Sequence, residues 1–373
     1  MLLKGVRVLD MSNLLPGPMC SLFLADLGAD IIKVESLSGD PMRYFESAKG
    51  RSPYFLALNR NKKSIALNLK TDEGKKIFMR LAKNADVVIE GFRPGKVDAL
   101  GIGYKSLKKI NQKIIYCSIT GYGQKGAYKN KAGHDLNYAA LSGMLDVISA
   151  EPFVAGVQIA DVSGALVAAF AIVSSLLYRE KHGKGNYIDM GVLDATLSVI
   201  GMHVAYRSVS ENTGTILSGS KPCYNVYRTK DGRFASLGAI EKKFWVNFCN
   251  AIGREDLIHR QFDGSRDVMN EVKAVFKSKA MDEWVRLNNK HDFCCEPVRK
   301  ISEVIKDDYF KSKKMLADID GIKQVAMPVA FSSFKKLKYS IAPKIGQDTE
   351  KILDGIGYNK NEIKKLKYSN VIL

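Results

Sequence analysis

The chain has 373 residues, of which 46% are hydrophobic and 26% are charged. This length exceeds what one hydrophobic core usually serves, so we expect a soluble globular protein with two domains, or with one large domain and a smaller one. Lys and Arg total 57 against 39 Asp and Glu, and the net charge of +18 indicates either an anionic partner or only a well-solvated surface. Because Lys is spread over the whole chain, the solvated surface is favoured, and we expect no nucleic-acid partner.

Targeting and metal-binding signals are weak. The six Cys form no CxxC pair and no His stands at zinc-finger spacing, so we expect reduced thiols, a cytoplasmic protein and no metal site. Residues 1–10 are too polar for a signal peptide. The apolar run 162–178 is interrupted by Ser and Gly and falls short of the ~20 residues that span a bilayer, so we expect a buried helix and no membrane association.

The first half of the chain alternates short apolar strands with helical patterns. Pro18 and Gly28 bound one predicted helix, and Thr71 can cap another whose first residues are acidic. The predicted strands are 6–10, 31–35, 64–69, 86–90 and 114–119, and the predicted helices are 18–27 and 72–83. Strands that alternate with helices indicate βαβ units, so we expect an α/β fold with a mostly parallel, Rossmann-like sheet.

The second half combines longer helices with a hairpin. Residues 201–223 include a stretch rich in Ser, Gly and Thr, which is typical of a linker. The turn Lys230-Asp231-Gly232 indicates a β-hairpin with strands 224–228 and 234–237. The remaining predicted elements are a strand at 186–190, a helix that starts at 192, and helices at 134–148, 161–181, 241–252, 281–289, 348–356 and 361–367.

The segment Gly133-His134-Asp135-Leu136-Asn137-Tyr138 is the first that could carry chemistry. A His at a helix start stands beside free backbone N–H groups, which can stabilise an oxyanion, and the positive helix end favours the neutral imidazole that acts as a base. His134 could equally be a helix cap, and the residues alone leave both roles open. The chain has no GxGxxG and no Walker loop, so the Rossmann-like pattern does not by itself predict NAD or ATP.

Two carboxylates stand at predicted helix starts. Asp161 opens a long apolar helix, where a structural N-cap is the commoner role, although the small Ser163 and Gly164 would leave the carboxylate open to a substrate. Glu241 also opens a helix. A Glu is common at this position because its negative charge is favourable at the positive end of the helix dipole, so Glu241 alone does not indicate a function.

Two strand-to-helix turns stand where ligands bind in such sheets. They are Leu15-Pro16-Gly17-Pro18 and Gly91-Phe92-Arg93-Pro94-Gly95. Arg93 could meet a phosphate, although turn chemistry is the better explanation of each loop taken alone. The loop Asn59-Arg60-Asn61-Lys62-Lys63 is either a solvated turn or a second phosphate contact.

Taken together, ordered segments along nearly the whole chain resemble the type III coenzyme A transferase family. Beyond the segments already quoted, the resemblance rests on Gly5-Val6-Arg7-Val8-Leu9-Asp10, Leu27-Gly28-Ala29-Asp30, Gly121-Tyr122-Gly123 and Ile345-Gly346-Gln347-Asp348-Thr349. The chain is most similar to the α-methylacyl-CoA racemase branch, which carries a His, an Asp and a Glu at the positions of His134, Asp161 and Glu241.

The resemblance implies a racemase that epimerises the α-carbon of a 2-methylacyl-CoA by 1,1-proton transfer through an enolate. His134 and Asp161 would be proton carriers on opposite faces of that carbon, Glu241 would hydrogen-bond His134, and backbone N–H groups near Asp161 would hold the enolate oxygen. The alternative is a CoA transferase in which Asp161 becomes an aspartyl-CoA thioester. Neither reaction needs a metal or a separate cofactor, because coenzyme A arrives as part of the acyl-CoA substrate.

The resemblance also implies contacts with coenzyme A. The residues it assigns to them are Leu15, Pro16, Lys62, Phe92, Arg93, Gly133, Asp135 and Tyr138. Several relatives have an Arg just after the strand at 31–35, but Ser36 stands there in this chain. Arg43 or Lys33 is expected to take over that contact.

An interlaced homodimer is the assembly that the resemblance implies. Each chain would have a large Rossmann-like, CoA-binding domain (1–200), a linker (201–223), a small α+β domain (224–325) and a C-terminal return to the large domain (326–373). The active site would lie between the large domain of one chain and the small domain of the other, so Glu241 could come from the partner.

Overall fold

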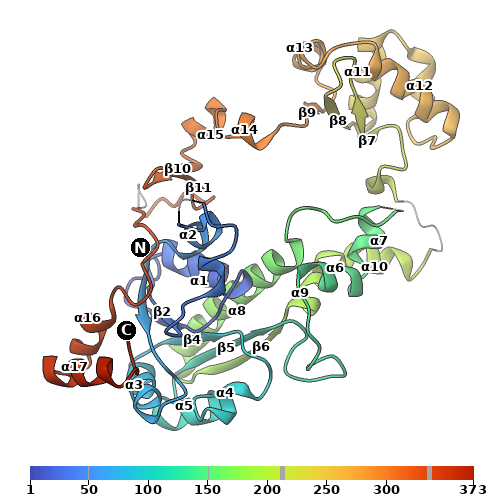
Figure 1. The fold of residues 1–373 in the computed structure, drawn as a ribbon. Helices are drawn as coiled ribbons and strands as arrows, with labels where there is room; N and C mark the ends of the chain where they lie inside the picture. Colours follow the sequence, from blue (N-terminus) through green and yellow to red (C-terminus); the bar gives the residue numbers. More distant parts are fainter. Residues whose placement is uncertain (49, 150, 211–214, 334–337) are drawn as a thin grey trace. The chain divides into compact units, whose positions relative to one another are not determined.

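The computed structural model describes residues 1–48, 50–149, 151–210, 215–333 and 338–373 (Figure 1). It divides into two compact units. The first contains residues 1–145, 153–200 and 311–373, and the second contains residues 146–152 and 201–310. Each unit has a hydrophobic core of its own, so each is described by itself.

A parallel sheet forms the centre of the first unit. Its strands follow the order β3-β2-β1-β4-β5-β6, which is the doubly wound order in which the strand sequence reverses beside β1. They are β1 (Arg7–Asp10), β2 (Asp30–Glu35), β3 (Lys62–Ala66), β4 (Val87–Glu90), β5 (Ile115–Thr120) and β6 (Asn186–Gly191). The predicted α/β fold with a Rossmann-like parallel sheet is therefore confirmed, and β3 begins two residues earlier than expected.

Helices cover both faces of this sheet (Figure 1). Adjacent strand residues point to opposite faces, so Val8 enters one core cluster and Leu9 the other. The cluster around Val8 includes residues of α1 (Pro16–Asp26), α6 (Asp135–Leu141), α8 (Ile159–His182) and α9 (Val192–Val199). The cluster around Leu9 includes residues of α3 (Asp72–Lys83), α4 (Lys96–Ala99), α5 (Tyr104–Ile110), α16 (Thr349–Asp354) and α17 (Lys360–Tyr368).

The helix predicted over 134–148 is two helices. Gly143 has φ +82°, a left-handed conformation that separates α6 from α7 (Met144–Ile148). Further elements of the first unit that were not predicted include the 3-10 helix η1 (Pro41–Arg43), α2 (Pro53–Asn59), α4 and α5.

Helix α8 is buried on one face only. Its length and composition would allow it to cross a membrane, which is weak evidence because core helices meet the same test. The buried residues include Ala160, Gly164, Ala168 and Ile172, and the exposed apolar residues include Leu166, Phe170, Val173 and Leu177. The expectation of a buried helix is therefore correct for one face of α8, whereas the other face exposes a stripe of apolar side chains.

The second unit is built on a small antiparallel sheet. The strands β7 (Tyr224–Arg228), β8 (Phe234–Gly238) and β9 (Cys295–Pro297) pair in that order, which confirms the predicted hairpin. Its helical elements are α10 (Gly201–Arg207), η2 (Ile216–Ser218), α11 (Lys242–Ile252), η3 (Glu255–Arg260), α12 (Arg266–Lys277), α13 (Met281–His291) and α14 (Ile301–Val304). The core contains Trp245, Phe248, Phe276 and Trp284. The linker predicted at 201–223 thus contains α10 and η2, and its residues 211–214 lie outside the described residues.

The chain returns to the first unit near α15 (Asp308–Ser312), earlier than the expected residue 326. The hairpin of β10 (Leu316–Ile319) and β11 (Ile322–Val325) belongs to the first unit because it contacts residues in and around α2. Arg60 Nη1 donates to Gln324 Oε1 at 3.3 Å, and Arg51 Nη1 lies 2.6 Å from Asp320 Oδ2.

Candidate active site

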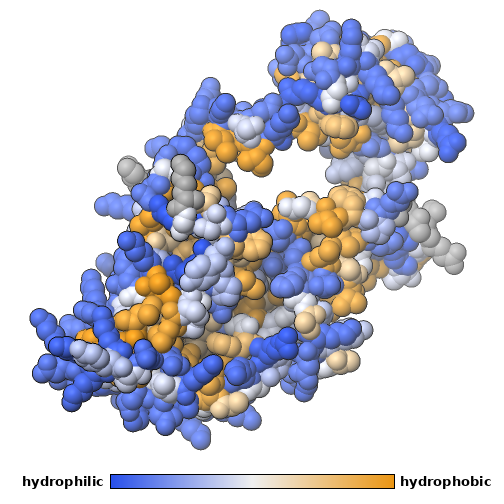
Figure 2. Space-filling view, in the orientation of Figure 1, coloured by the Kyte–Doolittle hydropathy of each residue, from blue (hydrophilic) through white to orange (hydrophobic). Residues whose placement is uncertain are grey.

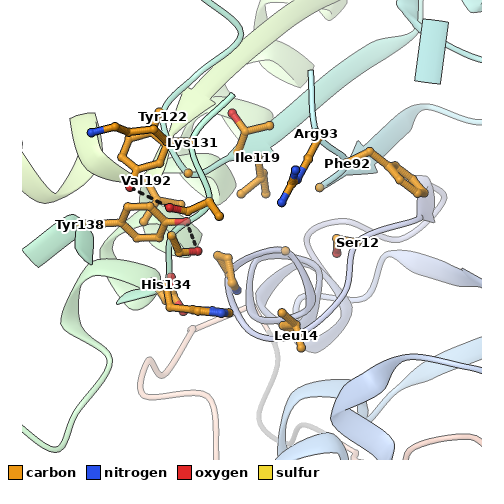
Figure 3. A pocket seen from close by; sticks show the side chains of 18 of the residues that line it. Ser12, Leu14, Phe92, Arg93, Ile119, Tyr122, Lys131, His134, Tyr138 and Val192 are labelled. Atoms are coloured by element: carbon orange, nitrogen blue, oxygen red, sulfur yellow. Dashed lines mark hydrogen bonds between the residues drawn. The ribbon is translucent and has the colours of Figure 1, made fainter. Parts of the chain in front are cut away.

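A cavity of about 480 Å3 opens at the carboxyl ends of the parallel strands in the first unit. Its walls come from the turns after β1, β4 and β5 and from the segment that leads into α6 (Figure 3). The lining residues are Ser12, Asn13, Leu14, Pro16, Gly17, Gly91, Phe92, Arg93, Pro94, Ile119, Thr120, Gly121, Tyr122, Lys129, Lys131, Ala132, Gly133, His134, Asn137, Tyr138, Asp161 and Val192. Ligands of doubly wound sheets bind at this edge, where the strand order reverses.

His134 stands at the N-cap of α6 with extended backbone. Its backbone N–H donates to Asn137 Oδ1 at 3.0 Å. The imidazole has no hydrogen-bond partner within the part of the chain that the structure describes, and Figure 3 shows it pointing into the cavity. The ring therefore does not cap the helix and is available to a ligand.

Two tyrosines fix the backbone before His134. Tyr138 Oη donates to the Gly133 carbonyl at 2.7 Å, and the Tyr122 and Tyr138 rings meet edge to face with centroids 5.2 Å apart. A Cβ at Gly133 would lie 2.6 Å from Tyr122 Oη and 2.8 Å from Tyr138 Cε1. Glycine is required here because any side chain would displace the rings that align His134.

Asp161 is the third residue of α8, not its N-cap, which is Gln158. The backbone N–H of Asp161 donates to Asp135 Oδ1 at 3.0 Å, so Asp135 provides the capping that the sequence assigned to Asp161. Within residues 151–210 and the other described ranges, the Asp161 carboxylate accepts no hydrogen bond. Burial, and secondly the charge of Asp135, raise the pKa of this carboxyl to about 7.

The cavity brings His134 and Asp161 together, because both side chains belong to its lining. An imidazole can donate or accept a proton at physiological pH, and so can the Asp161 carboxyl group, because its pKa is raised to about 7. The pair therefore has the chemistry for proton transfer on a ligand held between them.

Cations also line the cavity. Arg93 follows β4 on a turn that Glu90 holds, since Phe92 N–H donates to Glu90 Oε2 at 2.7 Å. No carboxylate pairs with Arg93 among the residues described, and its guanidinium points into the cavity in Figure 3. Lys129 and Lys131 add two positive charges, so the cavity suits an anionic ligand.

Lys129, Lys131 and Thr120 are among the lining residues that were not predicted. Lys129 and Lys131 precede the Gly133-His134 pair closely, so the basic spacing of this segment was a usable signal. Thr120 carries no such signal: its Oγ1 is buried and has no hydrogen-bond partner among the described residues, which only the fold reveals.

The residues predicted to contact coenzyme A divide into two groups. Pro16, Phe92, Arg93, Gly133 and Tyr138 line the cavity, whereas Leu15, Lys62 and Asp135 do not. The Lys62 ammonium is buried, donates to Asn59 Oδ1 at 2.8 Å and to the Pro18 carbonyl at 2.9 Å, and lies 3.3 Å from Asp10 Oδ2. These placements leave all eight cofactor contacts as predictions.

The two cations expected to replace the missing Arg at Ser36 have internal partners. Lys33 Nζ lies 2.8 Å from Asp40 Oδ2, and both side chains are fully buried. Arg43 donates to both carboxylate oxygens of Glu35, at 2.6 and 2.7 Å. Each charge is therefore already satisfied within the first unit.

Glu241 belongs to the second unit, where it is the N-cap residue of α11. The turn before it is held by Gln261 Nε2, which donates to the carbonyls of Ala239 and Ile240 at 3.1 and 2.6 Å. The hydrogen bond of Glu241 to His134 stays a prediction.

Comparison with known proteins identifies the family. The sequence model described as CoA-transferase family III matches residues 3–349. The chain is 32% identical to succinyl-CoA:glutarate CoA-transferase of Mus musculus, over 99% of this chain and 90% of that protein. It is 31% identical to alpha-methylacyl-CoA racemase of Homo sapiens, over 100% of this chain and 98% of that protein. A crystal structure of a CAIB/BAIF family protein from Brucella suis superposes with a TM-score of 0.85 at 30% identity, over 95% of this chain and 99% of that one. Relatives of both activities are thus similar to the chain, which belongs to CoA-transferase family III.

Proposed function

We propose that the protein is an acyl-CoA racemase that epimerises the α-carbon of a 2-methylacyl-CoA. The observation that carries the proposal is the shared cavity of His134 and Asp161. A racemase needs two proton carriers on opposite faces of one carbon, and each must be able to act as acid in one direction and as base in the other. A carboxyl group whose pKa lies near 7 meets that requirement, whereas an ordinary Asp would be too weak a base.

The proposed reaction passes through an enolate. One of the two side chains removes the α-proton, the electron pair moves onto the thioester oxygen, and the protonated partner returns a proton to the opposite face. The backbone N–H of Asp161 already donates to Asp135, so it does not hold the enolate oxygen in this arrangement. The positive N-terminal ends of α6 and α8, which carry His134 and Asp161, favour the negative charge that develops there.

Arg93, Lys129 and Lys131 fit the coenzyme A half of the substrate. Phosphate groups are anionic, and these three cations line the same cavity as His134 and Asp161. We propose that Arg93 contacts a phosphate of the bound thioester, which agrees with the role that the resemblance assigns to it.

Exchange of the α-proton tests the racemase proposal. Incubation with a 2-methylacyl-CoA in heavy water should introduce one deuterium at C2, because either side chain exchanges its proton with solvent before returning it. His134→Gln and Asp161→Asn should each reduce the exchange rate by about 10²–10⁴-fold. Absence of exchange across branched, aromatic and dicarboxylic acyl-CoA substrates would contradict the proposal.

CoA transfer is the second candidate, favoured by the similarity to succinyl-CoA:glutarate CoA-transferase and by the Asp161 carboxylate, which lines the cavity and accepts no hydrogen bond from any described residue. Asp161 would attack the thioester carbonyl and release CoA thiolate, leaving a mixed anhydride. The thiolate would then attack the Asp161 carbonyl, release the donor acid and form an aspartyl-CoA thioester. Hydroxylamine should trap this thioester as a hydroxamate on Asp161 only if transfer occurs, and the raised pKa makes the free carboxylate a minor form below pH 7.

We also propose that the protein is a homodimer that works in the cytoplasm without a membrane. Exposed apolar residues of the first unit support the dimer: Leu166, Phe170 and Leu177 on α8, Leu141 on α6, and Leu197 and Val199 on α9. Figure 2 shows apolar side chains gathered over the region where Figure 1 labels α6 and α9. Apolar surface of this extent is typical of a protein–protein interface.

A further inference from the structure

A buried pair of opposite charges lies behind the loop that joins β1 to α1. Lys33 comes from β2 and Asp40 caps η1, and neither side chain has any solvent exposure. Their charged atoms are 2.8 Å apart. Neither residue lines the cavity, so neither can touch a ligand there.

The pair reaches the cavity through the loop backbone. Lys33 Nζ donates to the Ser12 carbonyl at 2.8 Å, and Leu14 N–H donates to Asp40 Oδ1 at 3.2 Å. On the other side, Ser12 N–H donates to Asp10 Oδ1 at 2.9 Å. Ser12 and Leu14 both line the cavity, so three buried charges fix one of its walls.

Leu14 needs such support because its φ is +65°. The left-handed conformation is unfavourable for a residue with a Cβ, because the Cβ comes too close to the following carbonyl oxygen, and Leu is not among the residues that adopt it readily. The Leu14 side chain is 40% exposed and lines the cavity, so burial of the side chain does not offset this cost. Among the described residues, the hydrogen bond to Asp40 is the contact that holds the Leu14 amide.

We propose that Asp40, paired with Lys33, is a positioning residue for substrate binding: it holds Leu14 in the left-handed conformation and so shapes the cavity wall that the thioester meets. Stability alone does not account for the pair, since a buried ion pair is often no more stabilising than apolar residues of similar volume. The part of the inference that concerns the substrate rests on the proposed acyl-CoA function.

The first test needs no ligand. Asp40→Ala removes the acceptor oxygen and should increase the hydrogen-exchange rate of the Leu14 amide and of the other amides in residues 12–15 relative to the wild type. Exchange at these amides that stays at the wild-type rate would overturn the proposal. Should Asp40→Ala fail to fold because Lys33 is left unpaired, the double variant Lys33→Met/Asp40→Leu removes both charges together and carries the same expectation.

The second test separates the backbone conformation of Leu14 from its side chain. Leu14→Ala and Leu14→Gly both remove the side chain, but only Gly adopts positive φ without cost. With Asp40 intact, the two variants should bind an acyl-CoA thioether analogue with dissociation constants within about twofold of each other. In the Asp40→Ala background, which lacks the acceptor, the Leu14→Ala variant should bind about fivefold or more weakly than the Leu14→Gly variant, because the left-handed conformation is then no longer held by the hydrogen bond.

Equal affinities of the Leu14→Ala and Leu14→Gly variants in the Asp40→Ala background would overturn the positioning role. Failure of the proposed function looks different, because the wild type itself would then not bind the acyl-CoA analogue. In that case the exchange rates of the amides in residues 12–15 still decide whether the pair holds the loop.

Discussion

At the scale of single residues, the Asp161 carboxyl group should govern how the proposed racemase activity depends on pH. In the proposed reaction, one of the two side chains must be protonated and the other must not, whichever epimer is the substrate. The active forms of the His134–Asp161 pair therefore carry one proton in all, and kcat/KM should follow a bell-shaped pH curve of the same form for both epimers. Because the pKa of Asp161 is raised to about 7 from 3.8, one limb should lie near neutral pH. Rates of deuterium exchange measured from pH 4 to pH 10 check this. A curve whose only limb in that range lies near pH 4, where an ordinary Asp titrates, would contradict the assignment.

The same carboxyl group should make the protein less stable at alkaline pH. Its pKa is higher in the folded than in the unfolded chain, so its contribution to stability is complete below about pH 4 and is lost as the pH rises through 7. Asp161→Asn stays neutral, and its free energy of unfolding should exceed the wild-type value more at pH 8 than at pH 5, by about 1–2 kcal/mol after allowance for partial solvent screening. Urea denaturation at both pH values measures the difference.

A surface carboxylate provides the control for this stability prediction. Asp354 is exposed near the end of α16, and Asp354→Asn should change the free energy of unfolding equally at pH 5 and pH 8. A gain for Asp161→Asn that does not grow with pH would show that the folded protein does not penalise the ionised carboxylate.

At the scale of elements, Asp135 links α6 to α8. It follows His134 in the first helix and accepts the Asp161 N–H in the second, while its charge helps to raise the pKa of Asp161. Asp135→Ala should cost about 1 kcal/mol of stability through the lost cap and should also lower the pKa of Asp161. Asp135→Asn keeps an acceptor and removes the charge, so it should lower the pKa with little loss of stability. Denaturation and the pH profile of the two variants separate the effects, and equal stability of the two would count against the capping role.

The elements that could be predicted from sequence are those with strong local signals. The helix at 72–83 was predicted with its observed bounds because Thr71 caps it and its apolar positions recur on one face. The strands of the large sheet contain short apolar segments and were found within two residues, except at the carboxyl end of β3. The short η1, α2 and the β10–β11 hairpin were missed, because their stability depends on contacts with residues distant in sequence, such as that of Arg60 with Gln324.

The candidate site was predictable only in part, and for a physical reason. The sequence predicted His134 and Asp161 as site residues, but it could not distinguish a cap from a group open to a ligand, since this depends on which neighbour satisfies each backbone N–H. Asn137 and Asp135 do so here and leave both side chains without hydrogen-bond partners among the described residues. Lys62 shows the converse, because a basic residue in a polar loop proved to be fully buried beside Asp10.

At the scale of the whole molecule, the exposed stripe of α8 predicts how the chain assembles. Phe170 is 75% exposed on a helix whose opposite face lies in the core, and aromatic residues dominate the energy of many interfaces. Phe170→Glu should weaken the dimer by about 30-fold or more, as seen by light scattering over a range of concentrations. Tyr368, 80% exposed on α17 over the other face of the sheet, is the control, and Tyr368→Glu should leave the mass unchanged.

An interlaced dimer makes a sharper prediction about the origin of Glu241. In each proposed site, Asp161 would come from one chain and Glu241 from the other, so co-expressed Asp161→Asn and Glu241→Gln subunits would form hybrids with one site intact and one site doubly altered. Each variant alone should be nearly inactive, and the co-expressed mixture should recover about a quarter of wild-type exchange activity, as half of the dimers are hybrids with one working site. Activity is recovered only if each site is shared between two chains. If one chain supplied both residues of a site, every site in a hybrid would carry one of the two substitutions and none would be intact. A mixture no more active than the separate variants would therefore assign Glu241 to the same chain as Asp161, or remove it from the site.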